Sequence, residues 1–284
     1  MLVERIFAKL WKQFIFAQRD LGRSLVAALS TIDIALWDIK GQACRQSVHH
    51  LIGGAVDMIP VYITHGAAYG GAPVYSPEEL AAEAAHLVKL GNRFLKNTVG
   101  RQAVPNPEDD YVRMKVMREA VGPGVKLAMD ANARMTAEQA IRLCKLVEEL
   151  DIALFEEPVL DNDPRLLVEL KANTTIPIGV AENHKYAMRD ILVANAVDVV
   201  QPNVNNDGGY TGALRIAALA KAFNKPIGHG NGAAPTMWHS RPASRAARSS
   251  STTSISGWRT TPFSKMYRSR RMAFSTSHRL AALG

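Results

Sequence analysis

The feature that most constrains the fold is a regular alternation of two kinds of segment between residues 59 and 230. Short runs rich in β-branched and aliphatic residues are typical of buried strands, and the longer segments between them carry apolar residues at helical spacing. Such alternation predicts parallel strands joined by helical crossovers. We expect seven strands, at residues 59–66, 93–100, 126–130, 152–158, 176–183, 198–203 and 225–230.

Local signals mark where the intervening helices begin and end. Ser76 and Glu79 form a predicted capping box before an amphipathic segment, and Thr136 and Gln139 form a second one. Residues 24–43 also carry apolar side chains at helical spacing, so the first 54 residues are expected to be helical. We expect the helices of the repeating part at residues 76–91, 106–122, 136–150, 163–173, 185–196 and 209–224.

Two architectures fit this alternation, an open doubly wound sheet and a closed (β/α) barrel. The open sheet would carry a glycine-rich phosphate-binding turn after an early strand, and the sequence has none. In a barrel, the carboxyl ends of all strands meet at one mouth, where chemistry takes place. The strand ends of this sequence are its acidic positions, which favours the α/β fold of a TIM-like barrel.

Charge divides the chain unevenly. The net charge is +8, but the segment after Trp238 contains eight Arg and one Lys with no acid, so the preceding part is close to neutral. We expect a helical domain at 1–54, a barrel domain at 55–235, and a basic Ser/Arg-rich tail at 236–284. The tail is expected to be disordered or foreign to the rest, as after a reading-frame shift. Nucleic-acid binding would rest on this tail alone.

The remaining composition favours a cytoplasmic protein without a membrane anchor. Cys44 and Cys144 match no metal-binding or redox spacing, so both are expected to be free thiols. No apolar run approaches the roughly 20 residues that a membrane helix needs. Charged residues also interrupt the N-terminal segment, which excludes a signal peptide.

Three acids recur at one register of the predicted strands. Asp130, Glu156 and Glu182 follow one another at intervals of 26 residues, one βα unit each. Each alone could be a solvated strand end or a helix cap, but three carboxylates on one rim repel each other unless a cation lies between them. Hard oxygen ligands suit Mg²⁺. Asn132 and Glu157 lie beside these positions and would hold water or orient the ligands, or simply be solvated.

Five segments, in this order, resemble the mandelate racemase/muconate lactonizing enzyme group of the enolase superfamily. They are residues 30–42, 129–136, 155–159, 181–183 and 201–220, and the resemblance extends over about residues 1–232. It implies a (β/α)7β barrel with an α+β capping domain, which would be incomplete here at both ends. It also implies Mg²⁺ held by Asp130, Glu156 and Glu182. The implied reaction is removal of the proton α to a substrate carboxylate, with the metal stabilising the enediolate.

Departures from the family pattern concern the catalytic base. A Lys-x-Lys pair is implied at the end of the second strand, where this chain has Lys96 and Thr98, and threonine cannot replace a lysine base. Lys96 and Thr98 should share the mouth-facing side, so Lys96 could reach a substrate carboxylate or be a solvated strand end. The racemase branch implies an Asp at Asn203 and a His near Gly230. His229 is one residue early, which favours a satisfied buried histidine over a base.

We therefore expect a Mg²⁺-dependent lyase or isomerase acting on a small hydroxy-acid or sugar-acid carboxylate, with dehydration as the reaction. The predicted catalytic residues are Lys96, His229 and Asn203, and the predicted substrate contacts are Asn132 and Lys96. Alternatives are a racemase, epimerase or cycloisomerase of the same family, and a family member that keeps the metal site but has lost catalysis. Assembly into a homo-oligomer is also implied by the family.

Overall fold

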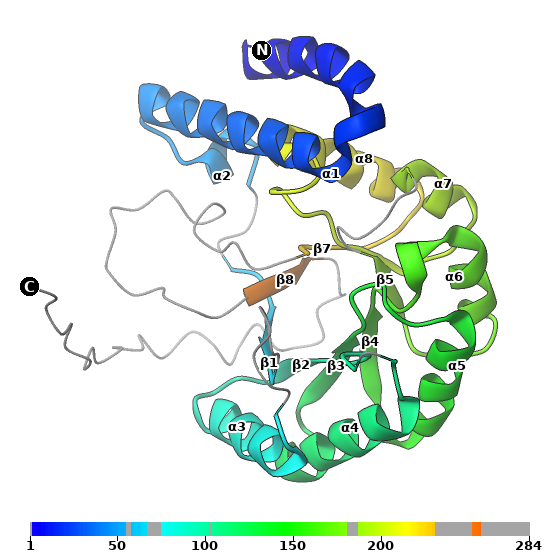
Figure 1. Ribbon diagram of the computed structural model, residues 1–284. Coiled ribbons are helices and arrows are strands. Elements are labelled where there is room, and N and C mark those ends of the chain that lie inside the picture. The colour runs from blue at the N-terminus through cyan, green and yellow to red at the C-terminus, as the bar shows by residue number, and fades with distance from the viewer. Residues whose placement is uncertain are drawn as a thin grey trace, which may run out of the picture.

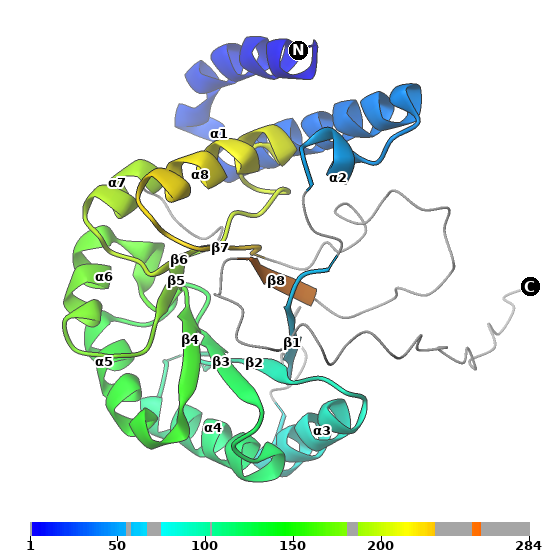
Figure 2. The same cartoon turned by 180° about the vertical axis from the view of Figure 1, so that it is seen from behind.

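The computed structural model describes residues 2–54, 58–66, 75–102, 104–180, 187–230 and 252–256, and for 12–23 and 252–256 it describes the backbone alone. Eight strands form a closed barrel in the order β1 to β8, and helices α3 to α8 lie outside it (Figures 1 and 2). The predicted barrel is therefore confirmed.

The observed elements agree with the expected ones, although several strands are shorter. The strands are β1 (Val61–His65), β2 (Phe94–Thr98), β3 (Lys126–Asp130), β4 (Ile152–Glu156), β5 (Ile178–Val180), β6 (Val199–Val200), β7 (Ile227–Gly228) and β8 (Thr252–Ser256). The helices are α1 (Leu2–Cys44), α2 (Val48–Leu51), α3 (Pro77–Lys89), α4 (Pro107–Val121), α5 (Ala137–Leu146), α6 (Pro164–Lys171), α7 (Met188–Val193) and α8 (Gly209–Ala222). Two 3₁₀ turns, η1 (Glu148–Leu150) and η2 (Leu160–Asn162), flank β4.

Both predicted capping boxes are present. The Ser76 hydroxyl accepts from the backbone N–H of Glu79, whose carboxylate accepts from the N–H of Ser76. Thr136 and Gln139 make the same reciprocal pair at the start of α5. Each pair satisfies backbone donors that the first turn of a helix leaves unpaired, which is why these helices begin where the sequence predicts.

Part of the basic tail belongs to the barrel. Strands β1 to β7 pair in parallel, but β8 pairs antiparallel with β1 and also with β7, and so closes the ring. Residues 252–256, in the tail that the sequence predicts to be disordered or foreign to the rest, therefore form a strand that closes the barrel, and the remainder of that expectation stays a prediction. The two edge strands offer unpaired backbone groups, and a segment with β-branched Thr252, Thr253 and Ile255 is suited to pair with them. The rest of the tail lies outside the described residues.

Apolar side chains fill both faces of the sheet. A large cluster lies between the strands and the outer helices, and includes Leu95, Leu127, Met129 and Phe155. A smaller cluster fills the barrel interior and consists of Tyr62, Phe94, Ala128, Leu154 and Val199. Because side chains alternate along a strand, the next interior positions toward the carboxyl ends are Lys96, Asp130, Glu156 and Gln201. The interior thus changes from an apolar layer to a polar one.

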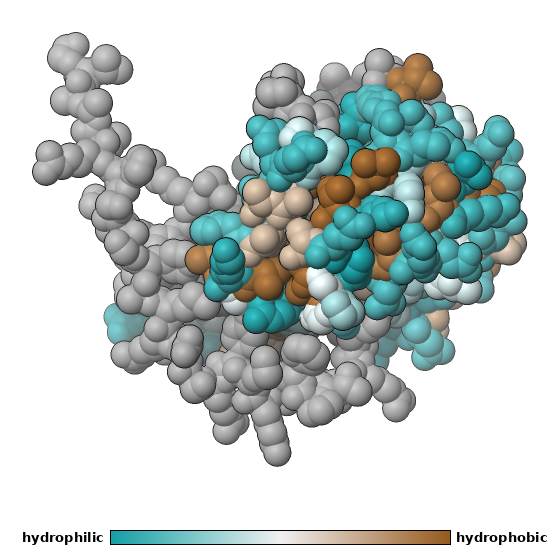
Figure 3. Space-filling model, turned by 90° about the horizontal axis from the view of Figure 1, so that it is seen from below, coloured by the Kyte–Doolittle hydropathy of each residue, from teal (hydrophilic) through white to brown (hydrophobic). Residues whose placement is uncertain are grey.

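Helix α1 lies against α8 on one side of the barrel (Figures 1 and 2). Trp37 and Val3 of α1 pack with Val204 and Tyr210, which lie before and at the start of α8. Seen from below, the described surface is mostly hydrophilic, with apolar residues scattered over it (Figure 3). Within the described part of the chain, no helix is long and apolar enough to cross a membrane.

Candidate active site

The polar interior layer brings two of the predicted metal ligands together. Asp130 ends β3, Glu156 ends β4, and the two are direct register partners across neighbouring parallel strands. Thr98, at the end of β2, is the register partner of Asp130 on its other side. The spacing of 26 residues therefore predicts correctly that these acids lie side by side. Glu182 follows β5 by two residues and lies outside the described part of the chain.

Lys96 lies between the two carboxylates. Its Nζ atom is 2.7 Å from Asp130 Oδ2 and 2.8 Å from Glu156 Oε1. All three side chains are almost completely buried, with 4% of each exposed. Burial alone would lower the pKa of Lys96, but the charges of Asp130 and Glu156 outweigh it and raise that pKa well above its ordinary value. Lys96 is therefore a buried cation and not a solvated strand end.

The second oxygen of Glu156 is held by two neutral donors. The Tyr62 hydroxyl donates to Glu156 Oε2 at 2.6 Å, and Gln201 Nε2 donates to the same oxygen at 2.9 Å. Burial raises the pKa of Glu156, while the positive charge of Lys96 opposes that shift. Gln201 reaches Glu156 across β5, where a side chain at Gly179 would approach Gln201 Oε1 to 2.2 Å. The glycine therefore keeps this path open.

Asn132 fixes the second oxygen of Asp130. Its backbone N–H and its Nδ2 atom both donate to Asp130 Oδ1, at 2.9 Å and 2.6 Å. Asn132 has a φ angle of 46°, a left-handed conformation that asparagine tolerates better than most residues. The turn after β3 thus orients the carboxylate, which is one of the two readings that the sequence leaves open for Asn132. A contact between Asn132 and substrate stays a prediction.

Other predicted residues line the polar layer without a catalytic contact. The Oγ1 atom of Thr98 and the Nδ2 atom of Asn203 are buried and have no hydrogen-bond partner among the described residues. Asn203 Oδ1 accepts from the N–H of Asn205, so this side chain also shapes the loop between β6 and α8. Its predicted catalytic role stays untested.

His229 follows β7 by one residue and is 7% exposed. Strand alternation places it on the side of Ile227, which packs against the core between strands and helices. This is the orientation that the one-residue shift in the sequence predicts. A catalytic role for His229 stays a prediction, and the geometry gives it no direct path to the polar layer.

Sequence reasoning missed Tyr62 and Gln201. Tyr62 lies in the first predicted strand, and Gln201 lies in a segment that was singled out for its family resemblance. Alternation could have placed both on the interior face. It could not show that they converge on Glu156, because this depends on how β1 and β6 are placed around the barrel relative to β4.

Two of the three predicted ligands of a divalent cation lie together, and among the described residues no group of three or more His, Cys, Asp or Glu side chains is arranged to hold a metal ion. Two buried carboxylates direct one oxygen each at a single point, and that point takes a positive charge, here the ammonium group of Lys96. Carboxylate oxygens are the ligands that Mg²⁺ prefers. Asp130 and Glu156 would be the described part of the ligand set, and Glu182 remains the predicted third member.

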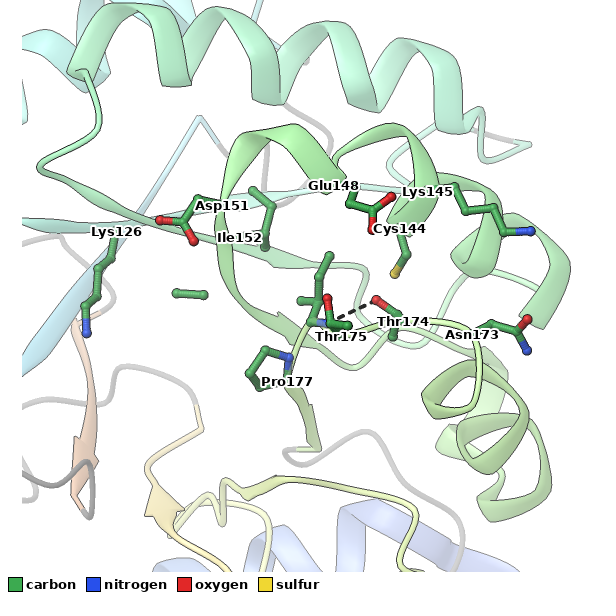
Figure 4. A pocket seen from close by; sticks show the side chains of 12 residues that line it. Lys126, Cys144, Lys145, Glu148, Asp151, Ile152, Asn173, Thr174, Thr175 and Pro177 are labelled. Carbon is green, nitrogen blue, oxygen red and sulfur yellow. Dashed lines mark hydrogen bonds between the residues drawn. The ribbon is translucent and has the colours of Figure 1, made fainter.

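A separate hollow of about 400 Å³ lies at the opposite end of strands β3 to β5 (Figure 4). Lys126, Cys144 and Asp151 are among its lining residues. Burial raises the pKa of the Cys144 thiol to about 11, so it stays protonated at neutral pH and is a poor nucleophile. Cys144 is a free cysteine, as expected, and the hollow is remote from the polar layer.

Comparison with known proteins identifies the family. Residues 79–266 match the family model described as enolase C-terminal domain-like, and residues 1–53 match the N-terminal domain of mandelate racemase/muconate lactonizing enzyme. The chain belongs to the mandelate racemase/muconate lactonizing enzyme family of the enolase superfamily. The resemblance in sequence is thereby confirmed, as is the fold that it implies.

Relatives in this family are sugar-acid enzymes. The chain is 33% identical over 237 residues to an arabinonate dehydratase of Saccharolobus solfataricus, covering 80% of this chain and 59% of that protein. It is 32% identical over 225 residues to a 3,6-anhydro-alpha-L-galactonate cycloisomerase of Streptomyces coelicolor, covering 78% and 59%. The chain therefore spans about 59% of the length of these relatives.

Solved structures of family members have the same fold. A racemase from Streptomyces coelicolor A3(2) with bound magnesium superposes with a TM-score of 0.71 at 30% identity, covering 79% of this chain and 61% of that one. A mandelate racemase/muconate lactonizing enzyme from a marine actinobacterium, in complex with magnesium, also has a TM-score of 0.71, at 28% identity over 85% of this chain and 67% of that one.

Proposed function

We propose that this chain carries out Mg²⁺-dependent removal of the proton α to the carboxylate of a sugar acid, with dehydration as the overall reaction. The observation that carries the proposal is the convergence of Asp130 and Glu156 on one buried cation position at the carboxyl ends of the barrel strands. The arabinonate dehydratase relative, and structures of family members with bound magnesium, support it.

The arrangement matches the demands of this chemistry. Removing an α-proton places negative charge on the substrate carboxylate, and a divalent cation at Asp130 and Glu156 would supply Lewis-acid stabilisation of that charge. Lys96 adds a second positive charge in a position closed to solvent. The hydroxyl group on the neighbouring carbon would then leave, with a proton, as water, and the resulting enol would tautomerise to a 2-keto-3-deoxy acid.

Residue 98 departs from the family pattern at the position of the catalytic base. Thr98 occupies the position where the family pattern implies a lysine, and a threonine hydroxyl cannot accept the proton at neutral pH. The candidate for the base that the sequence offers is His229, one residue before the position that the family pattern implies. The absence of lysine at residue 98 favours one alternative function, a family member that binds the metal but does not turn over substrate.

Proton exchange in D₂O tests the first chemical step directly. The chain is incubated with arabinonate, galactonate or gluconate in the presence of Mg²⁺, and NMR follows both loss of the C2 proton and formation of a keto acid. We expect Mg²⁺-dependent exchange that Glu156→Gln abolishes. Glu108→Gln serves as control, because the Glu108 side chain is 55% exposed and lies in a surface ion pair with Arg142.

The products separate the remaining alternatives. Exchange without a keto acid would indicate a racemase or epimerase. Metal binding without any exchange would support the inactive family member. Exchange that persists in the Glu156→Gln variant would contradict the assignment of the metal site.

A further inference from the structure

We infer that Lys96 is an exchangeable internal cation: it neutralises Asp130 and Glu156 in the metal-free protein and leaves them when a divalent ion binds. Once displaced, its ammonium group becomes available to the carboxylate of the substrate. The metal is then bound before the acid substrate, because only the metal releases Lys96. This inference rests on the proposed function, whose cation site it describes in greater detail.

Charge balance explains why Lys96 lies where it does. Asp130 and Glu156 are adjacent, buried and 3% exposed, so their mutual repulsion is poorly screened. The Nζ atom of Lys96 is within hydrogen-bond distance of both, which offsets that repulsion without a bound ion. Tyr62 assists, because its ring faces the ammonium group at 4.9 Å and its hydroxyl donates to Glu156.

The same contacts imply that Lys96 and a divalent ion exclude each other. Asp130 Oδ1 and Glu156 Oε2 already accept hydrogen bonds from other side chains. A divalent ion held by both carboxylates would therefore compete with Lys96 for the two remaining oxygens. Two cations at one buried position repel strongly. The bound metal therefore displaces the ammonium group, and the two compete for the same oxygens.

The structure offers Lys96 a direction in which to move. A lysine ammonium lies on a flexible four-carbon stem, so Nζ can shift while the backbone of β2 stays in place. Thr98 is the next interior residue toward the carboxyl end, and its buried Oγ1 atom has no hydrogen-bond partner in the described part of the chain. A polar group that could accept or donate a hydrogen bond is thus present beside Lys96, toward the carboxyl end of β2.

Thermal melts over a range of Mg²⁺ concentrations test the competition. The variants are Lys96→Met and Lys96→Gln, and the control is Lys126→Met, at the opposite, exposed end of β3. Without Mg²⁺, both Lys96 variants should melt at lower temperature than the unaltered chain, because two carboxylates lose their cation. Their apparent affinity for Mg²⁺ should rise about tenfold or more, since the competitor is gone.

A lysine with a purely structural role would give a different result. Lys96→Met would then lower the melting temperature while the dependence on Mg²⁺ stayed that of the unaltered chain, and this outcome overturns the inference. If Lys96→Met does not fold without metal, recovery of a cooperative melt on adding Mg²⁺ supports the exchange. Failure of Lys96→Gln to bind Mg²⁺ more tightly than the unaltered chain contradicts it.

The order of binding gives a second readout. Calorimetric titration of arabinonate into the unaltered chain should show binding with Mg²⁺ present and a loss of about tenfold or more in affinity without it. Equal affinity in both conditions would overturn the inference while leaving the proposed function in place. No response to Mg²⁺ from the unaltered chain or any variant would instead remove the proposed function, and the inference with it.

Discussion

Two buried groups of carboxylates in this protein are stabilised in opposite ways. At the junction of α1 and α8, Asp33 is 1% exposed and accepts from the Thr211 hydroxyl at 2.6 Å and from the Thr211 N–H at 2.9 Å. Trp37 Nε1 donates to the same hydroxyl at 3.0 Å. These donors are all neutral, whereas at the barrel end Asp130 and Glu156 share the full positive charge of Lys96.

The difference separates a cluster that joins α1 to α8, around Asp33, from a cluster whose cation we infer to be exchangeable, around Asp130 and Glu156. Asp33 lies at the N-terminus of α8, where unpaired N–H groups and the helix dipole favour a negative charge. Gly209 permits the close approach, because a side chain there would come within 2.3 Å of Asp33 Oδ2. Both donors to Asp33 belong to Thr211, one a backbone N–H and the other a short side chain, so neither can move away while α8 stays folded. The lysine between Asp130 and Glu156 belongs to neither carboxylate, and under the inference above a divalent ion would displace it, which would make that cluster the metal site.

Replacing Glu156 by leucine should have the largest effect on stability. Glu156→Leu leaves Lys96 with one carboxylate and removes the acceptor of Tyr62 and Gln201. Breaking one side of a buried ion pair costs about 3–5 kcal/mol of the free energy of unfolding. Urea denaturation measures the change, and a loss below about 1 kcal/mol would mean that the charges are not coupled in this way.

Asp110 is a third buried carboxylate, apart from Asp33 and from the pair of Asp130 and Glu156. It is 5% exposed and accepts from the N–H of Gly100 at 2.7 Å, and burial raises its pKa from 3.8 to about 6. A raised pKa means that this group favours folding most below pH 3.8, and that its contribution is lost as the pH rises through about 6.

Asp110→Asn has no charge to bury. Its free energy of unfolding, relative to that of the unaltered chain, should therefore rise as the pH is raised from 4 to 8. The upper limit is about 3 kcal/mol, from the shift in pKa. Denaturation midpoints at both pH values measure it. A difference between the two proteins that does not change with pH would contradict the raised pKa.

Replacing Asp33 by alanine should have a smaller effect, because its partners are neutral. Asp33→Ala leaves the Thr211 N–H and hydroxyl without their acceptor, at a cost of about 1–3 kcal/mol of the free energy of unfolding. Mg²⁺ binding should be unaffected. Thermal melts with and without Mg²⁺ check both parts, and loss of the Mg²⁺ response would remove the distinction between the two clusters.

An exposed acid should matter least. Glu108 and Arg142 form an ion pair in which both side chains are more than half exposed, so Glu108→Gln should change the free energy of unfolding by about 1 kcal/mol or less. Urea denaturation at low and high salt measures the change. A larger loss would indicate that exposure is a poor guide to the contribution of acids in this chain.

The sequence predicts those parts of the molecule that depend on local signals. Capping boxes at Ser76 and Thr136 define the start of two helices, and the equal spacing of Asp130 and Glu156 places them side by side. Lys96 is correctly predicted to face the interior with Thr98. Its position between the two acids is not predictable, because it depends on how neighbouring strands are staggered.

Contacts between segments far apart in the sequence were also not predicted, because they form only when the barrel closes. The pairing of β8 with β1 and β7 follows from the unpaired edges of a nearly closed barrel. The β-branched residues of 252–256 favour a strand, but the surrounding Ser/Arg-rich composition does not indicate which strands it pairs with. Tyr62 and Gln201 belong to distant strands, and they meet at Glu156 only once the barrel has closed.

Direct measurement of Mg²⁺ binding by calorimetry tests the central claim, that the cluster of Asp130, Glu156 and Lys96 is the metal site. The comparison uses the unaltered chain, Glu156→Gln and Asp33→Asn, each first shown to unfold cooperatively. The unaltered chain and Asp33→Asn should bind Mg²⁺ with the same affinity, and Glu156→Gln should not bind it measurably. Binding by Glu156→Gln at the affinity of the unaltered chain, or equal loss in Asp33→Asn, would contradict the account.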